Sequence, residues 1–361
     1  AMRGVDVSQP KLFVTRTVAD FVPKDHPLRA MRALVDEALE SLDGLFDDIY
    51  ADIGKASVAP ERLIRASLLQ VLYTIRSERQ LVEQIQYNML FRWFVGLERD
   101  DRVWHHSTFS KNRERLLDHA VLSELFTSVL GMARRRQLLS DDHFSIDGTL
   151  IEAWASHKSL RRRDDDDDDG PVGRERDYHG ERISNATHVS RTDPEAELMR
   201  KSKGKETRLR YGVHHVVENR NHLIVGVTTA PAAGVDEREA AIDLLAELPG
   251  EHRKTVGGDK GYDTFGFVAG CRAMNITPHV AMNDGRRGGS ALDQRTTRHP
   301  GYAVSQRKRK LIETTFGWTK QYGGMRRPMV RGLERMSAAV TFAATVFNLL
   351  RMRNLSAGAV G

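Results

Sequence analysis

The sequence predicts an α/β protein in which an all-α N-terminal region precedes a mixed sheet flanked by helices. Apolar residues recur with a helical period from Pro27 to about Ser140. After Asp142 the period changes to two, and segments typical of strands then alternate with segments typical of helices. We therefore expect a flexible tail over 1–24, a helical domain over 25–140 and an α/β domain over 141–361.

Helix-start signals support the helical domain. Pro60 stands at a first helical position before ERLIRASLLQVLYTIR, and SERQ at 77–80 has the form of a capping box. A further segment, LDHAVLSELFTSVLGMARRR at 117–136, carries apolar residues at helical spacing and ends in three arginines, which are favourable at a helix C-terminus. These signals predict at least three helices before residue 140.

The segment HSTFSKNRERL, 106–116, places hydroxyl groups and three cations, Lys111, Arg113 and Arg115, near a helix start. Such a segment can bind phosphates through its side chains and through the helix N-terminus. An ordinary solvated turn explains the same residues equally well.

The α/β domain is expected to begin with antiparallel strands and to continue with parallel ones. In chain order, we expect a strand at 143–154, a hairpin at 209–231, a helix at 237–248, a strand with a glycine-rich turn at 254–263, a helix at 265–275, a strand at 276–283 and a basic helix from about Ser305.

A polar insertion at 160–206 separates the first two strands. It has few large apolar groups and carries blocks of opposite charge, so we expect a mobile excursion. Its six adjacent aspartates, 164–169, repel one another and point in all directions, which favours a solvated loop over a metal site.

The net charge and the composition limit the kinds of molecule that the protein can be expected to bind and the compartment that it fits. The net charge is +6, and the segment from Gly301 onward carries 11 Lys and Arg against two acids, which indicates a polyanionic partner. The run MSAAVTFAATVFNLL, 336–350, is shorter than the roughly 18 residues of a membrane span, so we expect a buried core helix and no membrane contact. The single cysteine, Cys271, fits a reducing cytoplasm.

Three acidic residues stand where their elements could bring them together. Asp147 lies within the strand HFSIDGTLIEAW, Asp259 ends the strand TVGGD, and Glu313 lies on the basic helix RKRKLIETTFGWTK. If the two strands are neighbours, both aspartates meet at one edge, and a helix across that edge can add Glu313. Cations on the same helix face as Glu313 would contact a phosphodiester backbone that enters this site. An Arg309–Glu313 ion pair would explain only one of these cations.

Converging carboxylates repel each other unless a cation neutralises them. Oxygen ligands favour Mg²⁺, with Mn²⁺ as a possible substitute, over zinc. Two such ions, about 3.5–4 Å apart, are the general device for displacement at phosphorus. We therefore predict that Asp147, Asp259 and Glu313 are catalytic and metal-binding residues.

At these motifs the chain resembles the DDE transposases of bacterial insertion sequences, in particular the IS-four and IS-five group. The resemblance covers the helical N-terminal domain, SIDGT, GGDKGYD and RKLIETTFGWTK. That group's signature on the last helix places Tyr, Arg, Glu and Lys at fixed spacing. Here Arg309, Glu313 and Lys320 match it, and Gln306 stands at the tyrosine position.

The resemblance implies an RNase H-like catalytic core that uses the three acids to cleave the ends of a DNA element and join the freed 3′-hydroxyl to target DNA. It also implies that Arg309 and Lys320 hold phosphates of the terminal inverted repeat. The location that it implies is the bacterial cytoplasm, at the nucleoid. Because two ends must be cut together, we expect a homodimer or larger assembly that could form on DNA. The expected contacts to double-stranded DNA are Lys111, Arg113, Arg115, Lys260, Arg307, Arg309, Lys310, Lys320, Arg326 and Arg327.

Two alternatives belong to other classes. A haloacid-dehalogenase-type phosphohydrolase has a similar Asp-x-Asp-Gly-Thr motif, but Ser145 occupies the position of its nucleophile and cannot form an aspartyl phosphate. A catalytically silent DNA-binding protein derived from a transposase is the second alternative, although all three acids are present.

Overall fold

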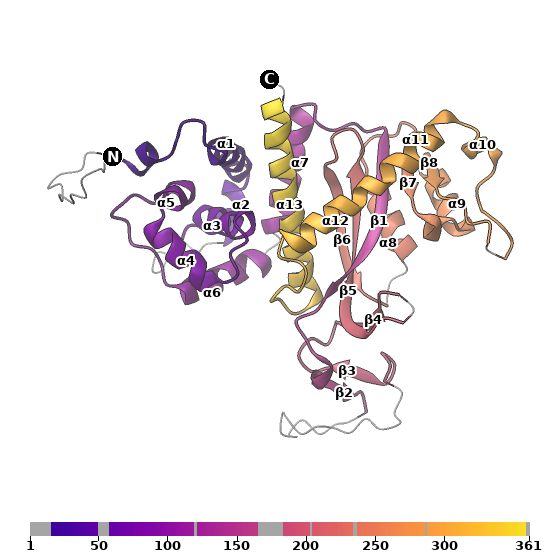
Figure 1. Ribbon diagram of the computed structural model, residues 1–361, viewed down its shortest axis with the longest axis horizontal. Coiled ribbons are helices and arrows are strands. Elements are labelled where there is room, and N and C mark those ends of the chain that lie inside the picture. The colour runs from indigo at the N-terminus through magenta and orange to yellow at the C-terminus, as the bar shows by residue number, and fades with distance from the viewer. Residues whose placement is uncertain are drawn as a thin grey trace, which may run out of the picture.

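The computed structural model describes residues 16–49, 58–118, 121–164, 183–202, 204–233, 237–285 and 287–358. A helical N-terminal body lies beside a sheet flanked by helices, and the long C-terminal helix α13 (Leu333–Gly358) stands between the two (Figure 1). The predicted fold class is therefore confirmed.

The N-terminal body is helical, as predicted. Its elements are η1 (Val18–Phe21), α1 (Pro27–Glu40), α2 (Asp43–Ile49), α3 (Pro60–Leu72), α4 (Glu78–Tyr87), α5 (Met89–Val95), α6 (His106–Asp118) and α7 (Val121–Arg135). Pro60 is the first residue of α3, and the Ser77 side chain accepts a hydrogen bond from the Gln80 N–H at the start of α4, which confirms both helix-start signals.

The packed part of the chain begins earlier than the expected tail over 1–24 allows. Residues 1–15 lie outside the described part, but Val18 and Val22 are buried where η1 packs against α5. The Arg29 guanidinium donates hydrogen bonds to the carbonyls of Ala19 and Val22, which holds this segment on α1.

The sheet is mixed. Its strands are β1 (His143–Glu152), β4 (Glu197–Arg200), β5 (Thr207–Glu218), β6 (Ile224–Pro231), β7 (Lys254–Gly258) and β8 (Ile276–Val280). The order is β4–β5–β1–β7–β8, with β6 also paired to β5. Strand β1 is antiparallel to β5 and parallel to β7, and β7 is parallel to β8. The hairpin, the crossover helices and the parallel strands expected from the sequence are all present.

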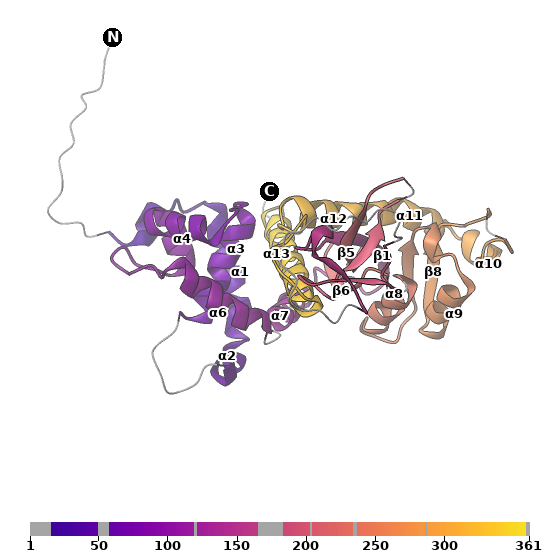
Figure 2. The same ribbon diagram turned by 90° about the horizontal axis from the view of Figure 1, so that it is seen from below.

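Helices cover both faces of the sheet (Figure 2). On one face, α8 (Glu237–Ala246) and α9 (Phe265–Ala273) pack on Phe144 and Ile146 of β1. On the other, α12 (Ile312–Gln321) and α13 pack on Ile151. The shorter elements are η2 (His157–Ser159), η3 (Lys260–Tyr262), α10 (Gln294–Thr297), α11 (Pro300–Lys308) and η4 (Arg309–Leu311).

Helix α13 is the buried core helix predicted at 336–350. Phe342 and Val346 belong to the core of the N-terminal helices, whereas Val340 and Ala344 belong to the core under the sheet. The helix therefore joins the two predicted domains through its opposite sides. None of the helices in the described ranges is long and apolar enough to cross a bilayer.

The insertion at 160–206 is more ordered at its ends than expected. Residues 165–182, which include most of the aspartate run, lie outside the described part. Around them, β2 (Leu160–Arg162) pairs with β3 (His188–Ser190), and β4 extends the main sheet. The buried Asp193 carboxylate accepts hydrogen bonds from the Tyr211 hydroxyl at 2.5 Å and from the Gly332 N–H at 3.2 Å. Both bonds reach Asp193 Oδ1, and they tie the insertion to β5 and to the start of α13.

Asn348→Ala should destabilise the protein strongly. Asn348 is fully buried, and its amide accepts from the Ile224 N–H at 2.9 Å and donates to the Ile224 carbonyl at 2.7 Å. Its removal would leave two buried backbone groups unpaired and lower the free energy of unfolding by about 2–4 kcal/mol. Chemical denaturation measures this loss. The matched control is Asn354→Ala on the exposed face of the same helix, and equal losses in both variants would contradict the prediction.

Candidate active site

Asp147 projects from β1 toward the face of the sheet that α12 covers. Alternation along the strand sends Ser145, Asp147 and Thr149 to this face and Phe144 and Ile146 to the opposite core. The Lys320 ammonium of α12 donates to the Thr149 hydroxyl at 2.6 Å, which places this helix directly over the row. Asp147 itself is half-buried.

Asp259 directly follows β7 and lies at the same height in the sheet as Asp147. Strands β1 and β7 are parallel neighbours, with Ser145 paired to Gly257, and β7 ends at Gly258, one residue before Asp259. The Asp259 side chain caps η3 by accepting from the Gly261 N–H at 2.6 Å. The expectation that the two strands are neighbours is therefore confirmed, and both aspartates lie at the same part of the sheet.

Glu313 reaches this place from the first turn of α12. The basic helix expected from Ser305 is divided into α11, the 3₁₀ turn η4 and α12. Close packing holds it on the sheet, because a Cβ added at Gly257 would lie only 3.2 Å from the Arg309 Cβ. Farther along α12, Phe316 stacks on the buried His215 ring at 4.4 Å between centroids.

The electrostatics of Asp147 show that the acids interact. Burial raises the pKa of the Asp147 carboxyl to about 7, although the Gly148 N–H opposes this rise. The charges of Glu237, Asp259 and Glu313 raise this pKa further. Residues as far apart in the chain as Asp147 and Glu313 therefore share one electrostatic environment, in which a positive charge would be favourable.

The donor set fits a hard divalent cation in its chemistry, since carboxylate oxygens are the ligands that Mg²⁺ and Mn²⁺ prefer. Within the described ranges, no three His, Cys, Asp or Glu side chains stand close enough together to hold an ion as they are placed. Asp147 Oδ1 accepts from the Gly148 N–H at 2.9 Å, and Asp259 turns to the Gly261 N–H. Both hydrogen bonds use Oδ1, which leaves Oδ2 of each carboxylate as a ligand for an ion.

Sequence reasoning missed a fourth acid, Glu237, at the first residue of α8. Its Oε1 accepts a hydrogen bond from the Tyr262 hydroxyl at 2.9 Å, and its charge is the first among those that raise the pKa of Asp147. A topological signal could have found it. Strand β6 runs parallel to β1, so the helix that follows β6 must begin at the edge where β7 ends.

Two of the signature residues on the last helix contact neighbours near the acids. Lys320 is half-buried against Thr149, and burial, followed by the charges of Lys201 and Arg210, lowers the pKa of its ammonium. Arg309 donates to the Gln306 side chain at 2.9 Å. Among the ion pairs of the described residues, none joins Arg309 to Glu313, so the simple ion-pair explanation of this face does not hold.

The other expected DNA contacts fall into two groups. Lys260, Arg307, Lys310, Arg326 and Arg327 are exposed in the catalytic half of the chain. On α6, Lys111 is exposed, whereas Arg113 forms an ion pair with Glu78 at 2.8 Å, and the side chain of Arg115 lies outside the described part. Arg327 lies over the partly exposed Trp154 ring, 4.9 Å from its centroid.

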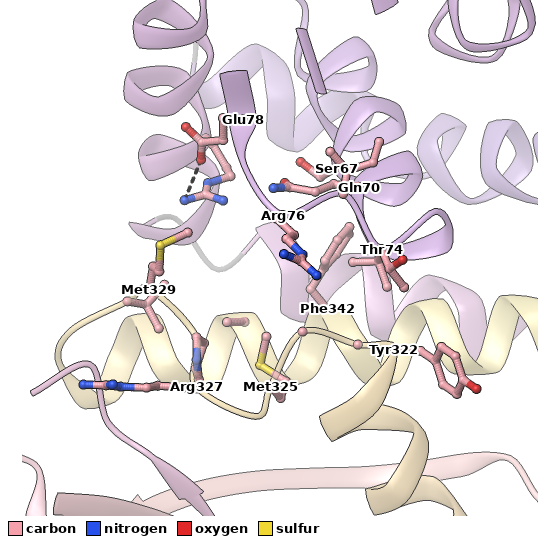
Figure 3. Close-up of a pocket in the computed structure, with 18 of the residues that line it drawn as sticks. Ser67, Gln70, Thr74, Arg76, Glu78, Tyr322, Met325, Arg327, Met329 and Phe342 are labelled. Carbon is pink, nitrogen blue, oxygen red and sulfur yellow. Dashed lines mark ion pairs between the residues drawn. The ribbon is translucent and has the colours of Figure 1, made fainter. Parts of the chain in front are cut away.

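A pocket of about 650 Å³ lies between the N-terminal helices and the segment that joins α12 to α13. Figure 3 shows Arg76 on the side of the N-terminal helices, and Met325 and Arg327 on the opposite side. The three acids Asp147, Asp259 and Glu313 do not line it. The pocket and the acid cluster are therefore separate features of the molecule.

Comparison with known proteins identifies both parts of the chain. A family described as a transposase domain, DUF772, matches residues 16–115, and one described as a transposase DDE domain matches residues 140–349. No curated protein matches the sequence. The second family match alone covers more than half of the chain.

Solved structures give distant similarities. The piggyBac transposase in a synaptic complex with hairpin DNA has 9% identity and a TM-score of 0.40, over 92% of this chain and 76% of that one. The Mos1 transposase in a pre-cleavage transpososome has 10% identity and a TM-score of 0.21, over 92% of this chain and 98% of that one.

Proposed function

Since this chain belongs to the DDE transposase family, we propose that it binds the terminal inverted repeats of its element, cleaves the element ends and joins each 3′-hydroxyl to target DNA. The observation that supports this most strongly is the convergence of Asp147, Asp259 and Glu313, from two neighbouring strands and the helix that crosses them. The family match assigns the SIDGT and GDKGYD motifs to a transposase domain, which speaks against the phosphohydrolase alternative.

In this proposal, the three carboxylates hold divalent cations and place them at the scissile phosphate. When bound, Mg²⁺ or Mn²⁺ ions, two for each site, supply activation of the attacking water or hydroxyl and stabilisation of the leaving oxygen. The protein contributes fixed elements. Asp259 is fixed by its cap on η3, and Glu313 is fixed by the packing of η4 and α12 on the sheet.

The proposed DNA surface follows α11, η4 and α12, which come one after another in the chain. These elements carry the cations Arg307, Lys310 and Lys320 as well as Glu313. Lys111 on α6 would add contacts from the N-terminal body, the region proposed for DNA binding and dimerisation. The spacing of Arg309, Glu313 and Lys320 supports placing the chain in the IS-four and IS-five group. A homodimer assembled on two element ends would allow both to be cut together.

A cleavage assay tests the proposal. The full chain is incubated with labelled DNA that carries the element ends, in Mg²⁺ and in Ca²⁺. We expect nicks at the element boundary in Mg²⁺ and binding without cleavage in Ca²⁺, because Ca²⁺ accepts a looser ligand geometry. Binding without cleavage in both ions would favour the catalytically silent DNA-binding protein.

Lys320→Met should weaken binding to the element ends and make that binding less sensitive to salt. A lysine that contacts a phosphate contributes roughly one unit to the slope of log K against log salt concentration. The measurement is a salt titration of end binding in Ca²⁺, with Arg208→Met as the control, since Arg208 is an exposed cation that already pairs with Glu152 and Glu206. An unchanged slope in Lys320→Met would remove Lys320 from the DNA surface.

A further inference from the structure

Two side chains, Glu237 and His214, lie over Gly148, and neither belongs to the proposed site of Asp147, Asp259 and Glu313. A Cβ added at Gly148 would lie 2.6 Å from Glu237 Oε1 and 2.7 Å from His214 Nδ1. Both distances are shorter than ordinary Cβ contacts, so any side chain at this position would have to displace the Glu237 carboxylate or the His214 ring. Glu237 and His214 thus lie close together on the same side of Gly148, the residue that follows Asp147.

His214 offers an unused polar atom to this space. The residue is 5% exposed, and its Nδ1 has no hydrogen-bond partner among the described residues. Burial lowers the pKa of the imidazole to about 4, so the ring is neutral at pH 7. A buried imidazole nitrogen without a partner costs free energy, unless it serves a bound group. A neutral imidazole can hydrogen-bond to a ligating carboxylate or to a water on a cation.

The Glu237 carboxylate is held in place from the other side. The Tyr262 hydroxyl donates to it, and Tyr262 itself is buried in η3, the turn that Asp259 caps. Tyr262 also lies in the field of Glu237, Asp147 and Asp259 together. The 3₁₀ turn η3 therefore connects Glu237, through Tyr262, to Asp259 of the proposed triad.

We propose that Glu237, which lies beside His214 over Gly148 and is held by Tyr262, is a fourth carboxylate of the active site and binds the same divalent cation as Asp147. The inference rests on the proposed function, since it needs Asp147 to be a cation ligand. Glu237 reaches the site from the α8 side of the sheet, whereas Glu313 reaches it from the α12 side. Acids on both faces of β1 would thus surround Asp147.

Direct Mn²⁺ binding to the full chain without DNA tests this inference. Free Mn²⁺ is measured by electron paramagnetic resonance, with the aspartates at 164–169 replaced by asparagine in every sample to remove competing ligands. Glu237→Gln should weaken the tightest Mn²⁺ site by about tenfold or more, as removing a group near a metal does. Glu237→Asp, which keeps the charge, should bind more tightly than Glu237→Gln at the same thermal stability.

Controls separate the outcomes. Glu239→Gln removes another exposed acid from the first turn of the same helix and should bind Mn²⁺ like the unaltered chain. Tyr262→Phe should keep most of the affinity, and an equal loss in Tyr262→Phe and Glu237→Gln would show that Glu237 acts only through the tyrosine and overturn the inference. Normal binding in Glu237→Gln with weakened binding in Asp147→Asn would also overturn it, while leaving the proposed function intact. Normal Mn²⁺ binding in both Glu237→Gln and Asp147→Asn would overturn the inference and the proposed function together.

Discussion

Asp147→Asn should abolish cleavage of the element ends and, at the same time, make the folded protein more stable above pH 7. The loss of cleavage follows from the proposed role of Asp147 as a cation ligand, and we expect a decrease of roughly 100-fold or more, since even groups around metal ligands contribute about 10–100-fold. Binding to the element ends in Ca²⁺ should persist, because the cations of α11 and α12 remain.

The gain in stability follows from the pKa of Asp147. The pKa is raised to about 7 in the folded protein from the ordinary aspartate value of 3.8, so the folded state holds the proton more tightly than the unfolded chain does. The carboxylate therefore destabilises the fold increasingly as the pH rises from about 4 to 7, and fully above 7. Asparagine carries no charge, so the variant should gain on the order of 3 kcal/mol at pH 8 and nothing below pH 4.

Chemical denaturation at pH 4 and pH 8, without divalent cations, measures this difference. Glu152→Gln is the control, because Glu152 lies on the same strand and pairs with Arg208 instead of facing other acids. It should leave cleavage unchanged and lower stability slightly. Reduced stability of Asp147→Asn at pH 8 would show that the acid is a structural residue, and unimpaired cleavage would refute its catalytic role.

Gly257→Val should eliminate cleavage without touching an acid. A Cβ at Gly257 would lie 3.2 Å from the Arg309 Cβ and 3.5 Å from the Ser305 carbonyl, so a branched side chain must push α11 and η4 away from the sheet. Glu313 follows η4 by two residues and would move with it. We expect cleavage to fall by roughly 100-fold, since displacements of about 1 Å have such effects, and stability to fall by about 1–3 kcal/mol.

Cleavage and denaturation assays on the same preparation separate the two effects. Gly266→Ala is the control, because the space around Gly266 on α9 is open. A stable Gly257→Val variant that cleaves normally would show that the seating of α11 and η4 does not set the position of Glu313.

The sequence predicted those features that local chemistry specifies. Pro60 and the SERQ segment mark helix starts because their side chains and backbone act within one turn. The change of period after Asp142 marks the sheet, since side chains alternate along a strand. The glycines next to Asp259 and the cations around Glu313 led to the prediction that the three acids form the site, and their role stays a prediction.

The sequence could not predict features that depend on partners distant in the chain. Strand β4 lies in a polar insertion whose composition indicates no structure, and its place is set by pairing with β5 and by the buried Asp193. The break at η4 also has no signal in the smooth helical pattern of 305–320. Both are consequences of packing, which a local pattern does not record.

By itself, the sequence determined the class of the fold and the order of its elements, because periodicity and turn chemistry are local properties of the chain. Only the tertiary structure decided that α13 joins both cores and that Glu237 and His214 lie together over Gly148. Strand register and helix seating decide such contacts, and both arise when segments far apart in the chain compete to bury the same surface.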